Sequence, residues 1–272
     1  MIEVISSPQN HRVKRLEKLI KSKSARDAEE LIVLDGIHLL SEYKRIYGLN
    51  FVDIFVEDNP QLINQFEKEL DVTFANLSTY LLSEKVMKKI SPVVSPSGLI
   101  AIGPMPPPSL DADAQHDGGL FIGLDGVQDP GNLGSILRTS LAFGVRKVFL
   151  SKGCADLWSV KTLRAGMGAQ FSIPVEKDIE LTQLVDKFSG DIYLASAKGG
   201  ISPQMLKNNY SSALVIFGSE GLGISEKVKI KVSKKLTLPL KNNVESLNVS
   251  AAVSAVCAVI ALEDGFPGME TR

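Results

Sequence analysis

Cysteine is scarce in this chain of 272 residues, which contains only two. Cys154 and Cys257 stand far apart in sequence and lack the close spacing of metal ligands. Both are surrounded by apolar or small residues, so we expect free, buried thiols. The scarcity of cysteine therefore argues against a disulfide framework and against a metal site.

The sequence also lacks a long apolar run and an excess of either charge. Its longest apolar stretch, Val249 to Leu262, contains serines and is too short to span a bilayer. The N-terminal residues have no apolar core of signal-peptide length, so we expect a cytoplasmic protein without membrane contact. The formal net charge is −1, so only local basic clusters can point to nucleic acid.

A segment rich in proline, acidic residues and glycine, at residues 102–119, interrupts the apolar patterns. Such a composition propagates neither a helix nor a strand ladder. We therefore predict a first domain at residues 1–105, a linker at 106–118 and a second domain at 119–272.

The first domain is predicted to be a small α/β domain, with a helix from Gln9 to about Arg26 and apolar runs at 31–35, 52–57 and 99–103. Its first helix is strongly basic, with only Glu17 opposing Arg12, Lys14, Arg15, Lys18, Lys21, Lys23 and Arg26. Taken alone, this pattern favours a solvated helix face, with phosphate contact as the alternative.

The second domain alternates near-continuous apolar runs with helical patterns. The runs are "GLFIGLD", "KVFLS", "DIYLASA", "ALVIFG" and "LTLPL", and the helical patterns begin at Asn132, Leu157, Leu181, Ser225 and Asn248. Strands of this kind are typical of a mainly parallel sheet covered by helices on both faces. Ligands of such sheets bind beyond the carboxyl ends of the strands. The loops after Leu124, Phe217 and Leu240 are therefore the candidate site.

The first of these loops reads "DGVQDPGNLG", and we expect Asn132 to cap the helix that follows. Its glycines do not have the G-x-G-x-x-G spacing of a dinucleotide site, and no P-loop Lys-Ser/Thr follows them. The spacing thus disfavours a nicotinamide-dependent enzyme. Arg138 lies beside the apolar stripe of this helix, where it could face a ligand or form a structural salt bridge.

The second loop, "FGSEGLG", places three glycines at the end of a buried strand, where the backbone can approach a ligand closely. Glu220 lies inside this turn and could orient Arg138 or face solvent. In the third loop we expect a strand that ends at Pro239 and a helix capped by Ser246 or Asn248. Small residues line that helix and permit close packing.

Together the three loops resemble the SpoU family of the SPOUT class, RNA ribose 2′-O-methyltransferases. The matching segments are "DPGNLGSILRT", "FGSEGLG" and "LPLKNNVESLNVSAA", in the family's order, and the resemblance spans Gly118 to Gly265. The segments "ISSPQNHRVKRL" and "SPSGLIAI" resemble the substrate-binding domain that often precedes it. The chain differs at Asp35-Gly36, where the family usually has Glu-Gly, and at Asn242, where it has glycine. Asparagine tolerates the left-handed backbone, so we expect the loop shape to persist.

The resemblance implies S-adenosylmethionine as methyl donor, a deep trefoil knot in the second domain, a first domain resembling a ribosomal-protein fold and a homodimer whose site draws on both subunits. It implies donor contacts at Gly218, Leu238 and Leu247, and we add Ser196 and Gly223 as candidates for the same site.

The resemblance also implies that Arg138 is the main catalytic residue, with Asn132, Glu220, Ser246 and Asn248 as its partners. A guanidinium is effectively always protonated, so stabilisation of the developing alkoxide is favoured over a role as base. A preceding substrate-binding domain favours RNA contact by Arg12, Lys14, Arg15 and Lys18. Ribosomal RNA is the expected substrate. Transfer RNA, a non-catalytic RNA-binding or assembly role, and an antibiotic-resistance role remain open alternatives.

Overall fold

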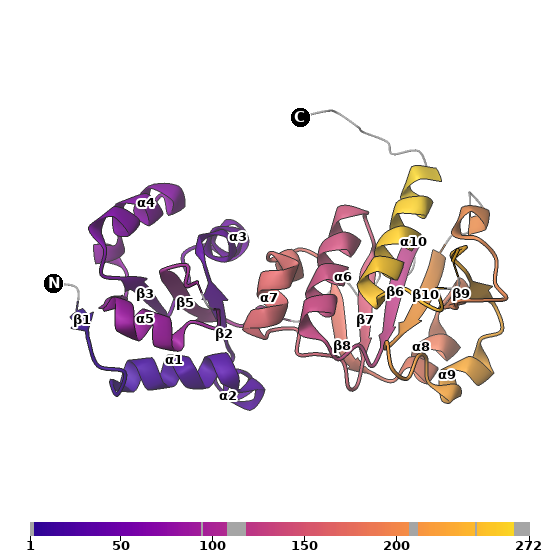
Figure 1. The fold of residues 1–272 in the computed structure, drawn as a ribbon, viewed down its shortest axis with the longest axis horizontal. Helices are drawn as coiled ribbons and strands as arrows, with labels where there is room; N and C mark the ends of the chain where they lie inside the picture. Colours follow the sequence, from indigo (N-terminus) through magenta and orange to yellow (C-terminus); the bar gives the residue numbers. More distant parts are fainter. Residues whose placement is uncertain (1–2, 94, 108–117, 207–211, 243, 264–272) are drawn as a thin grey trace. The chain divides into compact units, whose positions relative to one another are not determined.

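The computed structural model describes residues 3–93, 95–107, 118–206, 212–242 and 244–263, which form two compact units (Figure 1). The N-terminal unit contains residues 1–107 and also residues 156–171, which the sequence had assigned to the second domain. The C-terminal unit contains residues 108–155 and 172–272. Most of the predicted linker, residues 108–117, lies outside the described residues. No described helix is long and apolar enough to cross a membrane.

The N-terminal unit is the predicted α/β domain, built on a mixed five-stranded sheet in the order β1-β4-β3-β5-β2. β5 pairs antiparallel with β2 and β3, whereas β4 pairs parallel with β1 and β3. The strands are β1 (Glu3–Ile5), β2 (Leu31–Asp35), β3 (Asp53–Glu57), β4 (Thr79–Leu82) and β5 (Leu99–Pro104). The helices are α1 (His11–Lys21), α2 (Lys23–Glu29), α3 (Ile37–Tyr47), α4 (Pro60–Leu70), α5 (Glu84–Ile90) and α7 (Val160–Gly166).

The single helix predicted from Gln9 to Arg26 is wrong, because the chain breaks at Ser22 into α1 and α2. Ser22 has extended backbone, and its hydroxyl accepts a hydrogen bond from the Ala25 N–H at 3.2 Å. Serine side chains compete in this way for backbone donors, which makes serine a helix cap rather than an interior residue.

The C-terminal unit has a six-stranded sheet in the order β11-β9-β10-β6-β7-β8, and all neighbouring pairs are parallel. The prediction of a parallel α/β domain is therefore confirmed, while the knot stays a prediction. The strands are β6 (Gly119–Asp125), β7 (Lys147–Ser151), β8 (Val175–Ile179), β9 (Asp191–Ala195), β10 (Ser212–Gly218) and β11 (Lys235–Leu236). The helices are α6 (Pro130–Ala142), α8 (Leu181–Lys187), α9 (Glu226–Lys231) and α10 (Val249–Glu263).

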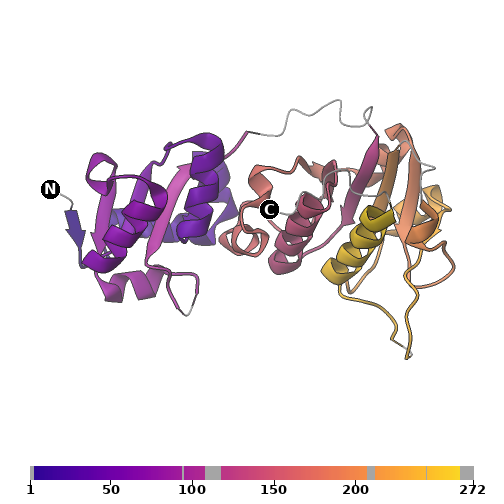
Figure 2. The ribbon, with the colours of Figure 1, turned by 90° about the horizontal axis from the view of Figure 1, so that it is seen from above.

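Helices cover both faces of this sheet (Figures 1 and 2). α8 and α9 pack on one face, over a core that includes Phe121, Leu214 and Ile216. α6 and α10 lie side by side on the other face, where the Thr139 and Ser254 hydroxyls are 3.1 Å apart. The small residues of α10 thus permit the close packing that the sequence indicated.

Both cysteine thiols are free, as predicted. Cys257 is buried in α10, and this burial raises the pKa of its thiol to about 12. Cys154 is only half-buried, so the prediction of burial holds fully for Cys257 alone. Its sulfur lies 3.4 Å from the carbonyl oxygen of Leu124.

Candidate functional site

A cavity of about 240 Å³ lies at the carboxyl ends of three neighbouring strands, β11, β9 and β10. This is the position that the parallel sheet predicted. Most of its wall is apolar, formed by Ala195, Ala197, Phe217, Ile224, Leu236, Leu238, Leu240, Leu247, Val249, Ala252 and Val256. Few polar side chains interrupt this wall, and they come from Ser196, Ser219, Glu220 and Ser246.

All five residues proposed as donor contacts line this one cavity: Ser196, Gly218, Gly223, Leu238 and Leu247. They come from separate segments between Ser196 and Leu247 that the parallel sheet brings to one edge. Their role as donor contacts stays a prediction, but the structure shows that they can act on one ligand.

Gly218 ends β10 where the chain turns back on itself. A Cβ atom at Gly218 would lie 2.1 Å from the carbonyl carbon of Gly223, so no larger residue fits without displacing the turn. Gly223 has φ +67° and donates its N–H to the Ser219 carbonyl at 2.9 Å. Both glycines are therefore required for the shape of this wall of the cavity.

The third loop differs from its prediction at its start. β11 ends at Leu236, not at Pro239, because its partner β9 ends at Ala195 and the next N–H, that of Thr237, donates to the carbonyl of Ile201. Leu238 and Leu240 thus belong to irregular chain that lines the cavity. Asn242 has φ 58°, which confirms the expected left-handed backbone at this position.

Three polar side chains, one from each loop, form a hydrogen-bonded cluster. The Asn132 amide donates to the Glu220 carboxylate, and the Asn248 amide donates to the same oxygen at 2.9 Å. Asn248 also donates to the Asn132 side-chain oxygen at 3.1 Å. This Asn132–Glu220–Asn248 cluster adjoins the cavity through Glu220, which lines it.

Asn248 is fixed by a second set of contacts. Its Oδ1 accepts hydrogen bonds from the backbone N–H groups of Ser250 at 3.0 Å and Ala251 at 3.3 Å, and so caps α10. Because the oxygen is occupied at the helix end, the amide nitrogen must face Glu220 and Asn132. Of the two predicted caps of this helix, the structure thus shows Asn248. Ser246 lies at the exposed edge of the cavity.

Asn132 does not cap α6, so that prediction is wrong. The helix begins two residues earlier, with Pro130 in its first turn and Asp129 as cap, whose carboxylate accepts from the Asn132 N–H at 2.8 Å. Proline suits the first helical position because its missing N–H would have no partner there. The shift leaves the Asn132 side chain available to Glu220.

Arg138 lies on α6 and is exposed. It forms no hydrogen bond or ion pair with the residues that the structure describes, so the expected Glu220–Arg138 pair is absent there. Glu220 is instead occupied by the two asparagines. The guanidinium of Arg138 is therefore available to a ligand or to another chain.

The four candidate RNA contacts on α1 separate into two kinds. Arg15 pairs with Glu29 and Asp53, and Arg12 lies 3.9 Å from Asp53 and over the Tyr80 ring. These arginines stabilise the N-terminal unit itself. In contrast, Lys14 and Lys18 are exposed, and neither forms a hydrogen bond or ion pair with the residues that the structure describes.

The sequence indicates a turn at Asp129-Pro130-Gly131, but sequence reasoning missed that Asp129 caps α6, and it missed Asp125 altogether. Asp125 ends β6 and accepts a hydrogen bond from the Ser225 N–H at 2.8 Å, which ties the second loop to the first. An aspartate directly after a buried strand, or directly before Pro-Gly, was the available signal.

The parallel sheet and its cavity define the class: an α/β protein that binds its ligand in the loops beyond the carboxyl ends of its strands. Residues 119–258 match the SpoU rRNA Methylase family, and residues 10–101 match the MRM3-like substrate binding domain. The chain belongs to the SpoU rRNA methylase family, as the three motifs predicted.

Similar proteins cover more than nine-tenths of the chain. An uncharacterized tRNA/rRNA methyltransferase of Synechocystis is 32% identical over 94% of this chain and 92% of its own. The 23S rRNA (guanosine(2553)-2′-O)-methyltransferase RlmP of Bacillus subtilis is 31% identical over 92% of this chain and 96% of its own. A crystal structure of an RNA 2′-O ribose methyltransferase is 25% identical, with a TM-score of 0.79 over 96% and 98% of the two chains.

Proposed function

We propose that this methyltransferase transfers a methyl group from S-adenosylmethionine to the 2′-hydroxyl of a ribose in RNA, and that this RNA is 23S ribosomal RNA. The observation that carries the proposal is the Asn132–Glu220–Asn248 cluster, which joins three loops beside one apolar cavity. The similarity to the RlmP protein of Bacillus subtilis supports the choice of ribosomal RNA.

The cavity suits the donor. Its apolar wall can enclose an adenine ring, while backbone groups at Ser196, Gly218 and Leu238 can bond the polar edges of the molecule. Gly218, which has no side chain, allows close approach of the backbone. When bound, S-adenosylmethionine supplies an electrophilic methyl group.

The cluster and Arg138 provide what the acceptor hydroxyl needs. A ribose hydroxyl is a weak nucleophile, so it must be oriented in line with the methyl group and release its proton to solvent as its oxygen replaces the donor's sulfur on the methyl carbon. The Asn132 amide, held by Glu220 and Asn248, keeps one N–H with which it orients the hydroxyl, and Ser246 contacts the ligand from the edge of the cavity. Arg138 stabilises the negative charge that develops on the oxygen.

Arg138 also motivates the homodimer in this proposal, because it has no partner among the described residues of its own chain. In a homodimer, Arg138 of one subunit contacts the RNA beside the donor of the other. Sedimentation at micromolar concentration tests this: we expect a dimer, and a monomer that retains full activity would contradict it.

The donor can be tested by thermal stabilisation. A ligand that binds only the native state raises the melting temperature, with about 2.7 kcal/mol of stabilisation at one hundred times its Kd. We expect S-adenosylhomocysteine to raise the melting temperature and NAD to leave it unchanged. Stabilisation by NAD alone would instead indicate a nicotinamide site and overturn the proposed donor.

Lys14 and Lys18 are proposed to contact RNA phosphates. Reversing both charges, in Lys14→Glu/Lys18→Glu, should weaken RNA binding and reduce the slope of log affinity against log salt by about 1.4 to 1.8, since each lost phosphate contact contributes about 0.7 to 0.9. Lys227→Glu/Lys231→Glu on α9 makes the same charge change and should leave the slope near the wild-type value. Equal slopes in all three proteins would show that Lys14 and Lys18 belong to a solvated helix face and do not contact RNA phosphates.

A further inference from the structure

Residues 156–171 lie between β7 and β8 in sequence, within the segment that matches the methylase family, yet they pack as part of the N-terminal unit. The chain therefore passes between the two units three times: after residue 107, after residue 155 and after residue 171. A single linker would require only one passage. Three kinds of contact hold the segment in the N-terminal unit.

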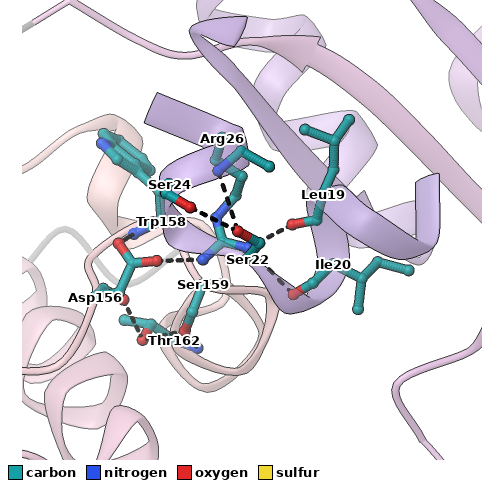
Figure 3. A network of polar contacts seen from close by, with 10 residues as sticks. Leu19, Ile20, Ser22, Ser24, Arg26, Asp156, Trp158, Ser159 and Thr162 are labelled. Carbon is teal, nitrogen blue, oxygen red and sulfur yellow. Dashed lines mark hydrogen bonds and ion pairs between the residues drawn. The ribbon is translucent and has the colours of Figure 1, made fainter. Parts of the chain in front are cut away.

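The first contact is a buried ion pair between Arg26 of α2 and Asp156 (Figure 3). Arg26 is 3% exposed, and its guanidinium also donates to the carbonyls of Leu19 and, at 3.1 Å, Ile20 at the end of α1. The second oxygen of the Asp156 carboxylate accepts from the Trp158 N–H at 3.1 Å. Both partners are thus oriented by other groups. Removing Asp156 leaves the buried Arg26 charge without its counter-ion, and removing Arg26 leaves the half-buried Asp156 carboxylate with the Trp158 N–H alone.

The second contact is an ion pair between Arg164 of α7 and Asp35 at the end of β2. The Asp35 side chain is 1% exposed, and its other oxygen accepts from the Ser97 hydroxyl at 2.9 Å. Asp35 is the residue at which this chain departs from the Glu-Gly of the family. The structure shows that its carboxylate binds Arg164 of residues 156–171.

The third contact is apolar. Val160 is 3% exposed and belongs to the core formed by α1, α5 and the sheet of the N-terminal unit. Phe171 packs edge-on against Tyr43, with ring centroids 5.6 Å apart, and the Tyr47 hydroxyl donates to the Phe171 carbonyl at 3.4 Å. Both ends of the segment and its middle are therefore fixed within the N-terminal unit.

We propose that Arg26, Asp156, Asp35 and Arg164 are positioning residues: they hold residues 156–171, which lie within the segment that matches the methylase family, in the substrate-binding unit, and methyl transfer to RNA depends on this docking. This inference rests on the proposed function. Its physical basis is that the docked segment connects the substrate-binding unit to the methylase segment after residues 155 and 171 as well as after residue 107, and the positioning of reacting groups contributes strongly to rate.

The test compares Arg26→Met, Asp156→Leu and the double variant in the full-length protein. Each single change leaves one buried charge unpaired and should lower kcat for RNA by about tenfold or more, because misplacement by about 1 Å can cost on the order of one hundredfold. The KM for RNA should stay within about threefold, and the affinity for S-adenosylhomocysteine within about twofold, because neither binding site has been changed.

The double variant provides the decisive comparison. An apolar pair of similar volume can replace a buried ion pair without loss of packing, so kcat should return to within about threefold of wild type. Single variants with wild-type kcat, or a double variant as slow as the singles, would overturn the assignment. Lys231→Met, which removes the ion pair to Asp186 within the C-terminal unit, is the matched control and should be unaffected.

Amide hydrogen exchange gives a readout that does not depend on activity. In the single variants, α7 and β2 should lose protection by about tenfold or more, while β9 and β10 keep theirs. Unchanged exchange in α7 and β2 would overturn the docking.

If the wild type transfers no methyl group, the proposed function fails, and hydrogen exchange alone then tests whether residues 156–171 are docked. If Arg26→Met precipitates, Arg164→Met, a change at the more exposed pair, replaces it.

Discussion

Replacing Arg138 by alanine is expected to lower the rate of methyl transfer by about one hundredfold to one thousandfold, the effect of removing one donor to a developing oxyanion. Arg138 is exposed, forms no contact with the described residues and lies outside the wall of the donor cavity. Its loss should therefore leave the affinity for S-adenosylhomocysteine within about twofold and the melting temperature nearly unchanged. Single-turnover transfer with saturating donor measures the effect.

A second substitution at this position separates charge from geometry. Arg138→Lys keeps the positive charge but loses the planar fork that can bind an oxygen and a phosphate together. We expect a rate between those of wild type and Arg138→Ala. Near-normal turnover in Arg138→Ala would show that this arginine is not the main catalytic group.

Replacing Gly218 by alanine is expected to reduce the affinity for S-adenosylhomocysteine by about one hundredfold or more. The new Cβ would lie 2.1 Å from the Gly223 carbonyl carbon and 2.3 Å from the Ile224 nitrogen, so the turn that forms one wall of the cavity must move. Overpacking of this kind typically costs about 1 to 3 kcal/mol. Isothermal titration of the purified variant measures the loss.

The same turn offers a matched control. A Cβ at Gly221 would meet no atom within 4 Å, so Gly221→Ala adds the same methyl group three residues away without a clash. It should bind S-adenosylhomocysteine nearly as wild type does. Equal affinities in Gly218→Ala and Gly221→Ala would show that the Gly218 turn does not form the donor site.

The sequence was sufficient for the elements whose apolar runs are long and buried. β2, β6, β7 and β10 were found at or within one residue of their ends, because continuous burial leaves an unbroken apolar pattern. β8 was missed because it lies at the sheet edge, where Glu176, Lys177 and Asp178 are exposed and hide the strand. β1 and β4 are too short to show a period.

Site residues were predictable where they lie in loops directly after strands. They were less predictable where their partners are set by tertiary contacts. The loops after Phe217 and Leu240 could be placed at one edge because parallel strands end together, and the resemblance to the SpoU family then singled out Gly218, Leu238 and Leu247. The partners of Glu220 could not be predicted, because the sequence offers both Arg138 and the two asparagines as partners for its carboxylate and does not distinguish between them. The docking of Asp156 onto Arg26, 130 residues apart, leaves no local signal at all.

The most direct test of the proposed methylation compares ribose methylation in ribosomal RNA from cells that carry the wild-type gene, lack it, or carry the Arg138→Ala form. Mapping 2′-O-methyl groups along 23S ribosomal RNA should reveal one position that is methylated only with the wild-type gene. An identical methylation pattern in all three RNAs would contradict the proposed activity. A methyl group that persists with Arg138→Ala would contradict the catalytic role of the arginine.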